Sequence, residues 1–138
     1  MTRPAITKPH YELLAELRRT LRKFHRFSSE AAKSAGLTPQ QHQALLAIKG
    51  FVGRDFVSIG ELASHLHIRH HSAVGLVDRL SGRGLVRRTA SLVDRRRVDV
   101  RVTPAGESKI ERLSKAHLRE LQLLGPGLRR ILRSMAAE

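Results

Sequence analysis

The sequence contains no cysteine and no tryptophan among its 138 residues, and aromatic residues make up only 4% of it. Without cysteine, the chain can form no disulfide, thiolate zinc site, cysteine nucleophile or thiol-based redox sensor. With so few aromatic side chains, the core must be built mainly from Leu, Ile, Val and Ala, a composition that suits helices. The sequence also offers no cluster of aromatics on which single-stranded bases could stack.

Acidic residues are scarce as well. Twelve Asp and Glu stand against 26 Lys and Arg, so the formal net charge is +14. This charge suggests a polyanion as the first partner to consider, and it is concentrated, because residues 69–101 carry nine arginines against three aspartates. The carboxylates are scattered, and no glycine-rich phosphate loop or Ser, His and Asp constellation occurs. These absences argue against an enzyme and predict no cofactor.

Long apolar runs are missing. The longest, Ala44 to Ile48, is far too short to span a bilayer, and the stretch from Met1 to Tyr11 lacks the apolar core of a signal peptide. We therefore expect a soluble, cytoplasmic protein with no membrane partner. The length suits one domain over residues 1–138, and no repeat or low-complexity linker divides it.

Helical periodicity marks both ends of the chain. Apolar or small residues recur in alternating steps of three and four from Leu14 to Ala35, and Gly36 can adopt the left-handed conformation that ends a helix. This narrow stripe resembles a heptad seam, which favours packing against another helix, either from a second subunit or from the same chain. Near the other end, Thr103 and Pro104 begin a helix. We expect residues 125–127, Gly-Pro-Gly, to break it and a last helix to follow.

Two capping boxes mark helix starts in the middle of the chain, at Thr38 to Gln41 and at Ser58 to Glu61. The first opens a helix that is expected to stop around Gly53, and the second opens a helix of little more than two turns. A further helix is predicted from Arg69 to Arg83. The three or four residues between the last two helices are typical of a helix-turn-helix.

Past Gly84 the apolar pattern alternates, so residues 85–89 and Val98 to Val102 are predicted to form two strands of a basic hairpin with its tip around residues 91–96. The expected order is four helices, a hairpin and two helices. The fold class is therefore mainly α (α+β), with a helix-turn-helix and a two-stranded β-hairpin over about residues 38–102, and with helices on either side over about residues 11–36 and 104–138.

Six short motifs occur in a specific order and spacing: Glu61-Leu62-Ala63, Leu66-His67-Ile68, Leu76-Val77-Asp78-Arg79-Leu80, Gly84-Leu85-Val86-Arg87-Arg88, Asp94-Arg95-Arg96 and Val102-Thr103-Pro104-Ala105-Gly106. With these motifs, the chain from about Leu13 to Met135 resembles the MarR family of bacterial transcription regulators. The resemblance implies a homodimer with a winged helix-turn-helix DNA-binding lobe over about residues 38–102 of each subunit and a two-stranded β-hairpin wing. The same resemblance implies that the helices over about residues 11–36 and 104–138 are dimerisation helices that interleave. It also implies that a small organic effector releases the DNA in many such regulators, although no residue here identifies one.

The predicted helix from Arg69 to Arg83 would enter the major groove with its first turn facing the base edges. Gly75 would permit close approach to a thymine methyl or to the backbone, and Arg79 would meet phosphate further along the helix. The candidate major-groove residues are Arg69, His70, His71, Ser72, Gly75 and Arg79.

The wing is expected to contact the minor groove, where the resemblance implies that an arginine at the wing tip inserts. Arg96 is the first choice for this role, because a narrow A·T-rich groove concentrates negative potential. Asp94 is placed to pair with Arg96 and fix its direction, while Arg95 and Arg97 would contact phosphates.

The candidate dimerisation residues lie on the two terminal helices: Leu14, Leu17, Leu21, Leu121, Leu124, Leu128, Ile131 and Leu132. These features together predict a sequence-specific, double-stranded DNA-binding transcription regulator. By family habit it is expected to act as a repressor, with a homodimer on a palindromic operator whose half-sites lie about 10 base pairs apart or a multiple of that.

Two other functions stay open at this point. A sequence-neutral nucleic-acid-binding or architectural protein would fit the charge, although a recognition helix would then be wasted. A metal-responsive regulator would use His65, His67, His70 and His71, which lie close in sequence. Against the metal site, His70 and His71 point in different directions on a helix, and no carboxylate joins the cluster after Glu61.

Overall fold

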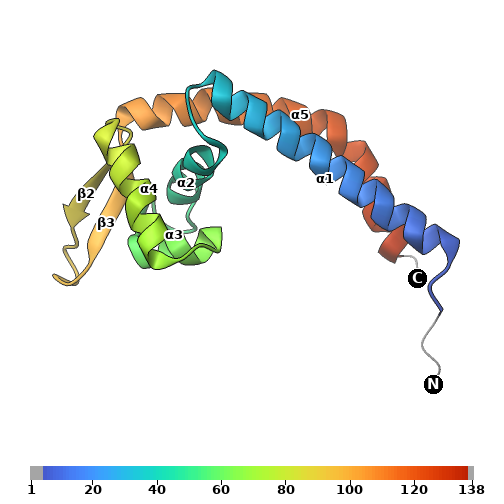
Figure 1. Ribbon diagram of the computed structural model, residues 1–138, viewed down its shortest axis with the longest axis horizontal. Coiled ribbons are helices and arrows are strands. Elements are labelled where there is room, and N and C mark those ends of the chain that lie inside the picture. Colours follow the sequence, from blue (N-terminus) through green and yellow to red (C-terminus); the bar gives the residue numbers. More distant parts are fainter. Residues whose placement is uncertain (1–4, 137–138) are drawn as a thin grey trace.

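Two long helices, α1 (Lys8–Ser34) and α5 (Pro104–Ala136), run side by side in the computed structural model and form an arm that leads away from a compact lobe (Figure 1). The structure describes residues 5–136, so residues 1–4 and 137–138 of the predicted domain lie outside the described part. The lobe contains α2 (Pro39–Lys49), β1 (Phe56–Ser58), α3 (Ile59–Leu66), α4 (His70–Gly82), β2 (Val86–Ala90) and β3 (Val98–Val102). The predicted fold class is confirmed.

The core lies between the helices of the lobe and its sheet. Its largest fully buried side chains are Leu45, Ile48, Val57, Leu62, Leu76, Val77, Leu80 and Val100. The arm joins the same core through Ala32 of α1 and through Ile110 and Leu113 of α5. Lys109 at the start of α5 also donates a hydrogen bond to the carbonyl of Ala35 at 2.7 Å. The arm and the lobe are therefore packed together at their junction.

The local signals for helix ends are confirmed. The hydroxyl of Thr38 accepts from the Gln41 amide at 3.0 Å, and the Gln41 side chain accepts from the Thr38 amide at 3.1 Å, which makes the predicted capping box. Gly36 has a φ of +75°, as a left-handed residue after a helix requires. The helix α2 ends at Lys49, a few residues before the predicted stop near Gly53, because the chain already turns at Gly50.

The sheet has three strands in the order β1-β3-β2, all antiparallel. The hairpin of β2 and β3 was predicted, with Val86 opposite Val102 and Ala90 opposite Val98. The strand β1 was not predicted, because three residues are too few to show alternation. It forms only because Val57 pairs with Val100 of β3.

The predicted break at residues 125–127 is wrong, because α5 continues for 33 residues through Pro126. Proline in a helix interior removes one hydrogen bond and costs about 3 kcal/mol, but its fixed φ is compatible with a helix. Beyond it, Ile131 is only 2% exposed and lines the same small cavity as Leu13 of α1. Burial of Ile131 against α1 stabilises the last turns of α5, because tertiary packing contributes more to the stability of helices in proteins than local propensity does.

Two histidines meet where α1, α2 and α5 pack together. His42 is 3% exposed, and its Nδ1 has no hydrogen-bond partner. The ring of His117 lies 4.9 Å away, centroid to centroid, and its Nε2 is 2.9 Å from the hydroxyl of Ser28. Burial first, and then the neighbouring His117, lowers the pKa of His42 below its ordinary value of 6.5.

We therefore expect the free energy of unfolding to fall as the pH is lowered from about 7 to 5. In this range the unfolded chain binds a proton at His42 that the folded chain does not, so acid favours unfolding. Replacing His42 by leucine should remove part of this dependence, measured by urea unfolding at several pH values. His65→Leu, at an exposed histidine, is the matched control. An unchanged pH dependence in His42→Leu would contradict the assignment.

Candidate nucleic-acid interface

The helices α3 and α4 form a helix-turn-helix around a tight turn at residues 67–69. His67 ends α3 in the left-handed conformation, with φ 55° and ψ 44°, and the amide of Ile68 donates to the carbonyl of Ala63 at 3.0 Å. The helix α4 then buries one face in the core through Ala73, Leu76, Val77 and Leu80. Its opposite face is left free to meet a ligand.

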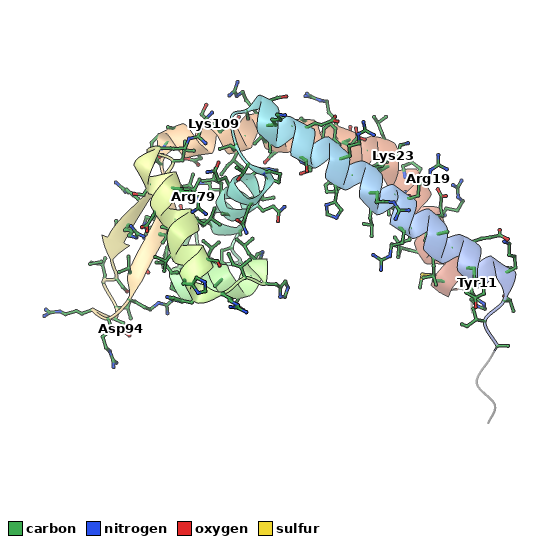
Figure 2. All side chains as sticks on the ribbon, in the orientation of Figure 1. Tyr11, Arg19, Lys23, Arg79, Asp94 and Lys109 are labelled. Carbon is green, nitrogen blue, oxygen red and sulfur yellow. The ribbon has the colours of Figure 1, made fainter. Side chains whose placement is uncertain are left out.

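The predicted major-groove residues lie on α4 or at its start. Arg69 is the N-cap, and the side chains of His70, His71 and Ser72 are exposed in the first turn. Arg79 is exposed further along α4 (Figure 2). A Cβ added at Gly75 would lie 3.4 Å from Nη1 of Arg79, which is an ordinary contact with the end of a flexible side chain. The first turn of α4 thus offers a cation, two imidazoles and a hydroxyl to a partner.

The tip of the wing is organised by its own hydrogen bonds. The Ser91 hydroxyl accepts from the amides of Val93 and Asp94, both at 3.2 Å. Asp94 Oδ1 accepts from the Arg96 amide at 3.0 Å and lies 3.5 Å from Arg96 Nε, so the predicted pairing is present. The side chain of Arg96 is 93% exposed. Figure 2 shows Asp94 at the far tip of the hairpin.

An ionic network at the base of the wing was not predicted. Glu61 forms the expected capping box with Ser58, and its carboxylate also pairs with the guanidinium groups of Arg54 and Arg97. Partial burial would raise the pKa of Glu61, but the hydrogen bonds from Ser58 and the charges of the two arginines outweigh it and lower the pKa below its usual value. The capping pattern identified Glu61, but no sequence motif indicates its arginine partners, of which Arg54 lies seven residues away and Arg97 lies 36 residues away.

The predicted dimerisation residues differ in burial within the single chain. Ile131 is already buried against its own α1, and Leu17, Leu124 and Leu128 are half-buried. The remaining four are exposed: Leu14, Leu21, Leu121 and Leu132. Further exposed apolar side chains on the arm were missed: Tyr11, Leu118, Leu123 and Met135. Figure 2 places Tyr11 near the end of the arm farthest from the lobe.

Two other kinds of site were searched for along residues 5–136. Within this range, no group of three or more His, Cys, Asp or Glu side chains is arranged to hold a metal ion. The ligand set that the metal-responsive alternative requires of His65, His67, His70 and His71 is therefore not assembled there. None of the helices in the same range has an apolar stretch of the length that a bilayer crossing needs.

The chain was compared with known proteins. A model described as the MarR family matches residues 35–97, which include the helix-turn-helix and most of the wing. A protein from Pseudomonas aeruginosa described as a probable transcriptional regulator is 30% identical, with 88% of this chain and 91% of that chain covered and a TM-score of 0.63. The chain belongs to the MarR family. Members of the MarR family are transcription regulators rather than enzymes, in agreement with the predicted function class.

One further solved structure is similar in fold, and two curated proteins are similar in sequence. A MarR family protein from Bacillus stearothermophilus has a TM-score of 0.78 at 23% identity, over 96% of this chain and 97% of that chain. The HTH-type transcriptional repressor MdtR of Bacillus subtilis is 28% identical over 82 residues, which are 59% of this chain and 51% of MdtR. A putative transcriptional regulatory protein for the hcr operon of Thauera aromatica is 31% identical over 99 residues, which are 72% of this chain and 58% of that protein. The chain thus spans between 51% and 58% of the length of these two curated relatives.

Proposed function

We propose that this MarR family chain binds double-stranded DNA in a sequence-specific manner and represses transcription as a cytoplasmic homodimer. One observation carries the proposal: the exposed first turn of α4 and the outward-directed Arg96 belong to the same lobe. A second supports it, because residues 69–101, which contain both, hold nine arginines against three aspartates. The core shared by the arm and the lobe supports residues 1–138 as one domain.

In this proposal the start of α4 reads base edges in the major groove. Arg69, His70, His71 and Ser72 are placed to do so, and Gly75 allows α4 to approach closely. A bidentate contact of an arginine with guanine contributes roughly 1 to 3 kcal/mol of discrimination against other bases. Arg79, further along the exposed side, meets the phosphate backbone.

The wing supplies contacts that depend less on sequence. Arg96, held by Asp94, enters the minor groove where an A·T-rich stretch narrows it. Arg95 is exposed beside it, and Arg97 lies at the base of the same loop, so both add positive charge near the phosphates.

The arm supports assembly of two copies. Leu14, Leu21, Leu121 and Leu132 leave an apolar face exposed along α1 and α5, as expected of helices that interleave with a partner. A two-fold dimer would bind a palindromic operator with half-sites about 10 base pairs apart or a multiple of that. The proposal includes release by a small organic effector, whose chemistry no described residue identifies.

The proposal predicts that selection from a random DNA library will enrich one palindromic sequence. On that sequence, Arg96→Ala should weaken binding about 10- to 100-fold, because a hydrogen bond to a charged group contributes about 1.5 to 3 kcal/mol. The same variant should weaken binding to all sequences alike, whereas His70→Ala should change the preferred bases. Affinity is measured by fluorescence anisotropy over a range of salt concentrations.

The matched control is Arg19→Ala, which removes the same charge from the arm, away from the lobe (Figure 2). It should leave operator affinity nearly unchanged. If no sequence is enriched, and both arginine variants weaken binding to any DNA equally, the chain is a sequence-neutral binder and the proposed regulator is refuted.

A further inference from the structure

One carboxylate joins the start of α3 and the loop just before it to the base of the wing, which lies 36 residues further along the sequence. Oε1 of Glu61 accepts from the Ser58 amide at 2.9 Å, at the start of α3, and from the guanidinium of Arg97 at the base of the wing. Oε2 accepts from the guanidinium of Arg54, in the loop that leads into β1. Both carboxylate oxygens of Glu61 therefore accept hydrogen bonds, and one of them binds the wing.

The wing loop has few other attachments. The ladder of β2 and β3 ends at Ala90 opposite Val98, and the amide of Ser91 still donates to the Arg97 carbonyl at 3.1 Å. Other hydrogen bonds of residues 91–97 stay within the loop. Among the described residues, the ion pair of Arg97 with Glu61 is the one side-chain bond that connects this loop to the helix-turn-helix.

We propose that Glu61 is a positioning residue for DNA binding, which holds the wing loop, residues 91–97, to the helix-turn-helix through Arg97. The strands of the wing are held separately, β3 by its pairing with β1 and β2 by the ion pair of Arg88 with Asp78 of α4. This inference rests on the proposed function. Arg96 is the residue before Arg97 in this loop. The position of its side chain relative to α4 therefore depends on the Glu61–Arg97 bond, which holds the loop. Arg97 is then a tether within the protein, and its role differs from the phosphate contact expected of a wing arginine.

The surroundings of Glu61 make it suited to this role. The Arg54 guanidinium lies 4.7 Å from the centre of the Phe51 ring and 4.9 Å from that of Phe56, so it is held on the side of Oε2. Phe56 is also covered by Arg101, whose side chain pairs with Asp55 at 3.1 Å. Arg54 thus fixes one oxygen of the carboxylate and leaves the other directed at Arg97.

The test uses Glu61→Gln, Arg97→Gln and the double variant in the full-length chain, titrated on the selected operator. Glutamine is a natural residue at this position of a capping box, so the start of α3 keeps its hydrogen bonds while the charge is lost. Each single variant should weaken binding about tenfold, and the double variant should be no weaker than either, as expected when two residues act as one unit. Arg97→Lys should retain most of the affinity.

A second readout separates positioning from folding. In Glu61→Gln, the minor groove under the wing should lose its protection from hydroxyl radicals. The guanines contacted by α4 should stay protected from methylation at N7 in the major groove. Arg26→Gln is the control, because it removes an exposed arginine that pairs with Glu30 on α1, outside the Glu61 network. It should keep both protections.

Two results would overturn the inference. If Glu61→Gln binds and protects DNA like the wild type, the tether has no role, although the proposed function stands. If Arg97→Gln lowers the slope of log affinity against log salt by about 0.9 and its effect adds to that of Glu61→Gln, Arg97 neutralises a phosphate instead. Arg97→Gln leaves the capping box intact, so its salt slope and its protection of the minor groove still test the role of Arg97 if Glu61→Gln does not fold. Failure of the wild type to select any sequence would refute the proposed function itself.

Discussion

Replacement of Gly106 by alanine is expected to destabilise the protein by about 3 kcal/mol, in the upper range for overpacked sites. A Cβ at this position would lie 2.3 Å from the carbonyl oxygen of Leu85 and 2.8 Å from Cγ1 of Val102. The Leu85 carbonyl cannot easily move away, because it accepts a hydrogen bond from the Thr103 amide at 3.0 Å. The first turn of α5 therefore packs directly on the turn that follows α4.

Urea unfolding monitored by circular dichroism measures this effect. Gly82→Ala is the matched control, because nothing lies within 4 Å of its added methyl group and it sits in the last turn of α4. It should be neutral or stabilising by up to about 1 kcal/mol, since alanine favours a helix over glycine. Equal unfolding midpoints for Gly106→Ala and the wild type would mean that α5 does not approach Leu85 as closely as described.

Replacement of Leu132 by aspartate is expected to separate the proposed dimer into monomers and to weaken operator binding by about 10²- to 10⁴-fold. Leu132 is 60% exposed on α5, so the charge does not disturb packing within one chain. In a dimer the aspartate would be buried without a partner, which is costly. The loss of affinity follows because two linked lobes bind neighbouring half-sites far more tightly than one.

The comparison is made by light scattering after gel filtration and by titration of the operator. Leu46→Asp is the matched control, because Leu46 is 46% exposed on α2, outside the arm. It should remain dimeric and keep its affinity. A Leu132→Asp protein that still elutes as a dimer would show that this face of the arm is not the interface.

The features that could be predicted from the sequence are those encoded by neighbouring residues. Thr38 and Ser58 each bond a residue three positions away, and the positive φ of Gly36 and Gly84 needs nothing beyond glycine itself. The pairing of Asp94 with Arg96 is similarly local. Local signals of this kind are sufficient to locate the helix-turn-helix and the wing tip along the chain.

The features that could not be predicted depend on distant partners. The strand β1 exists because Val57 pairs with Val100, and Pro126 stays in a helix because Ile131 packs against α1. Arg97 reaches Glu61 across 36 residues of sequence, so a run of wing arginines gave no sign that one of them is engaged within the protein. Periodicity reports which face of a helix is apolar, but it does not report which neighbour covers that face.

Because α5 is a single unbroken helix, a rotation of its end in the arm would be transmitted to the lobe. At 1.5 Å per residue its 33 residues span about 50 Å, from the contact of Gly106 with Leu85 to the arm where Ile131 packs on α1 (Figure 1). Over that length a rotation of about 5° at the arm displaces the lobe by about 4 Å, slightly more than the 3.4 Å spacing of stacked base pairs. A break in the helix at residues 125–127 would have absorbed such a rotation, and the lobe would not have moved. In the proposed dimer, the crossing angle of the two arms would set the distance between the two α4 helices, and hence whether they match successive major grooves.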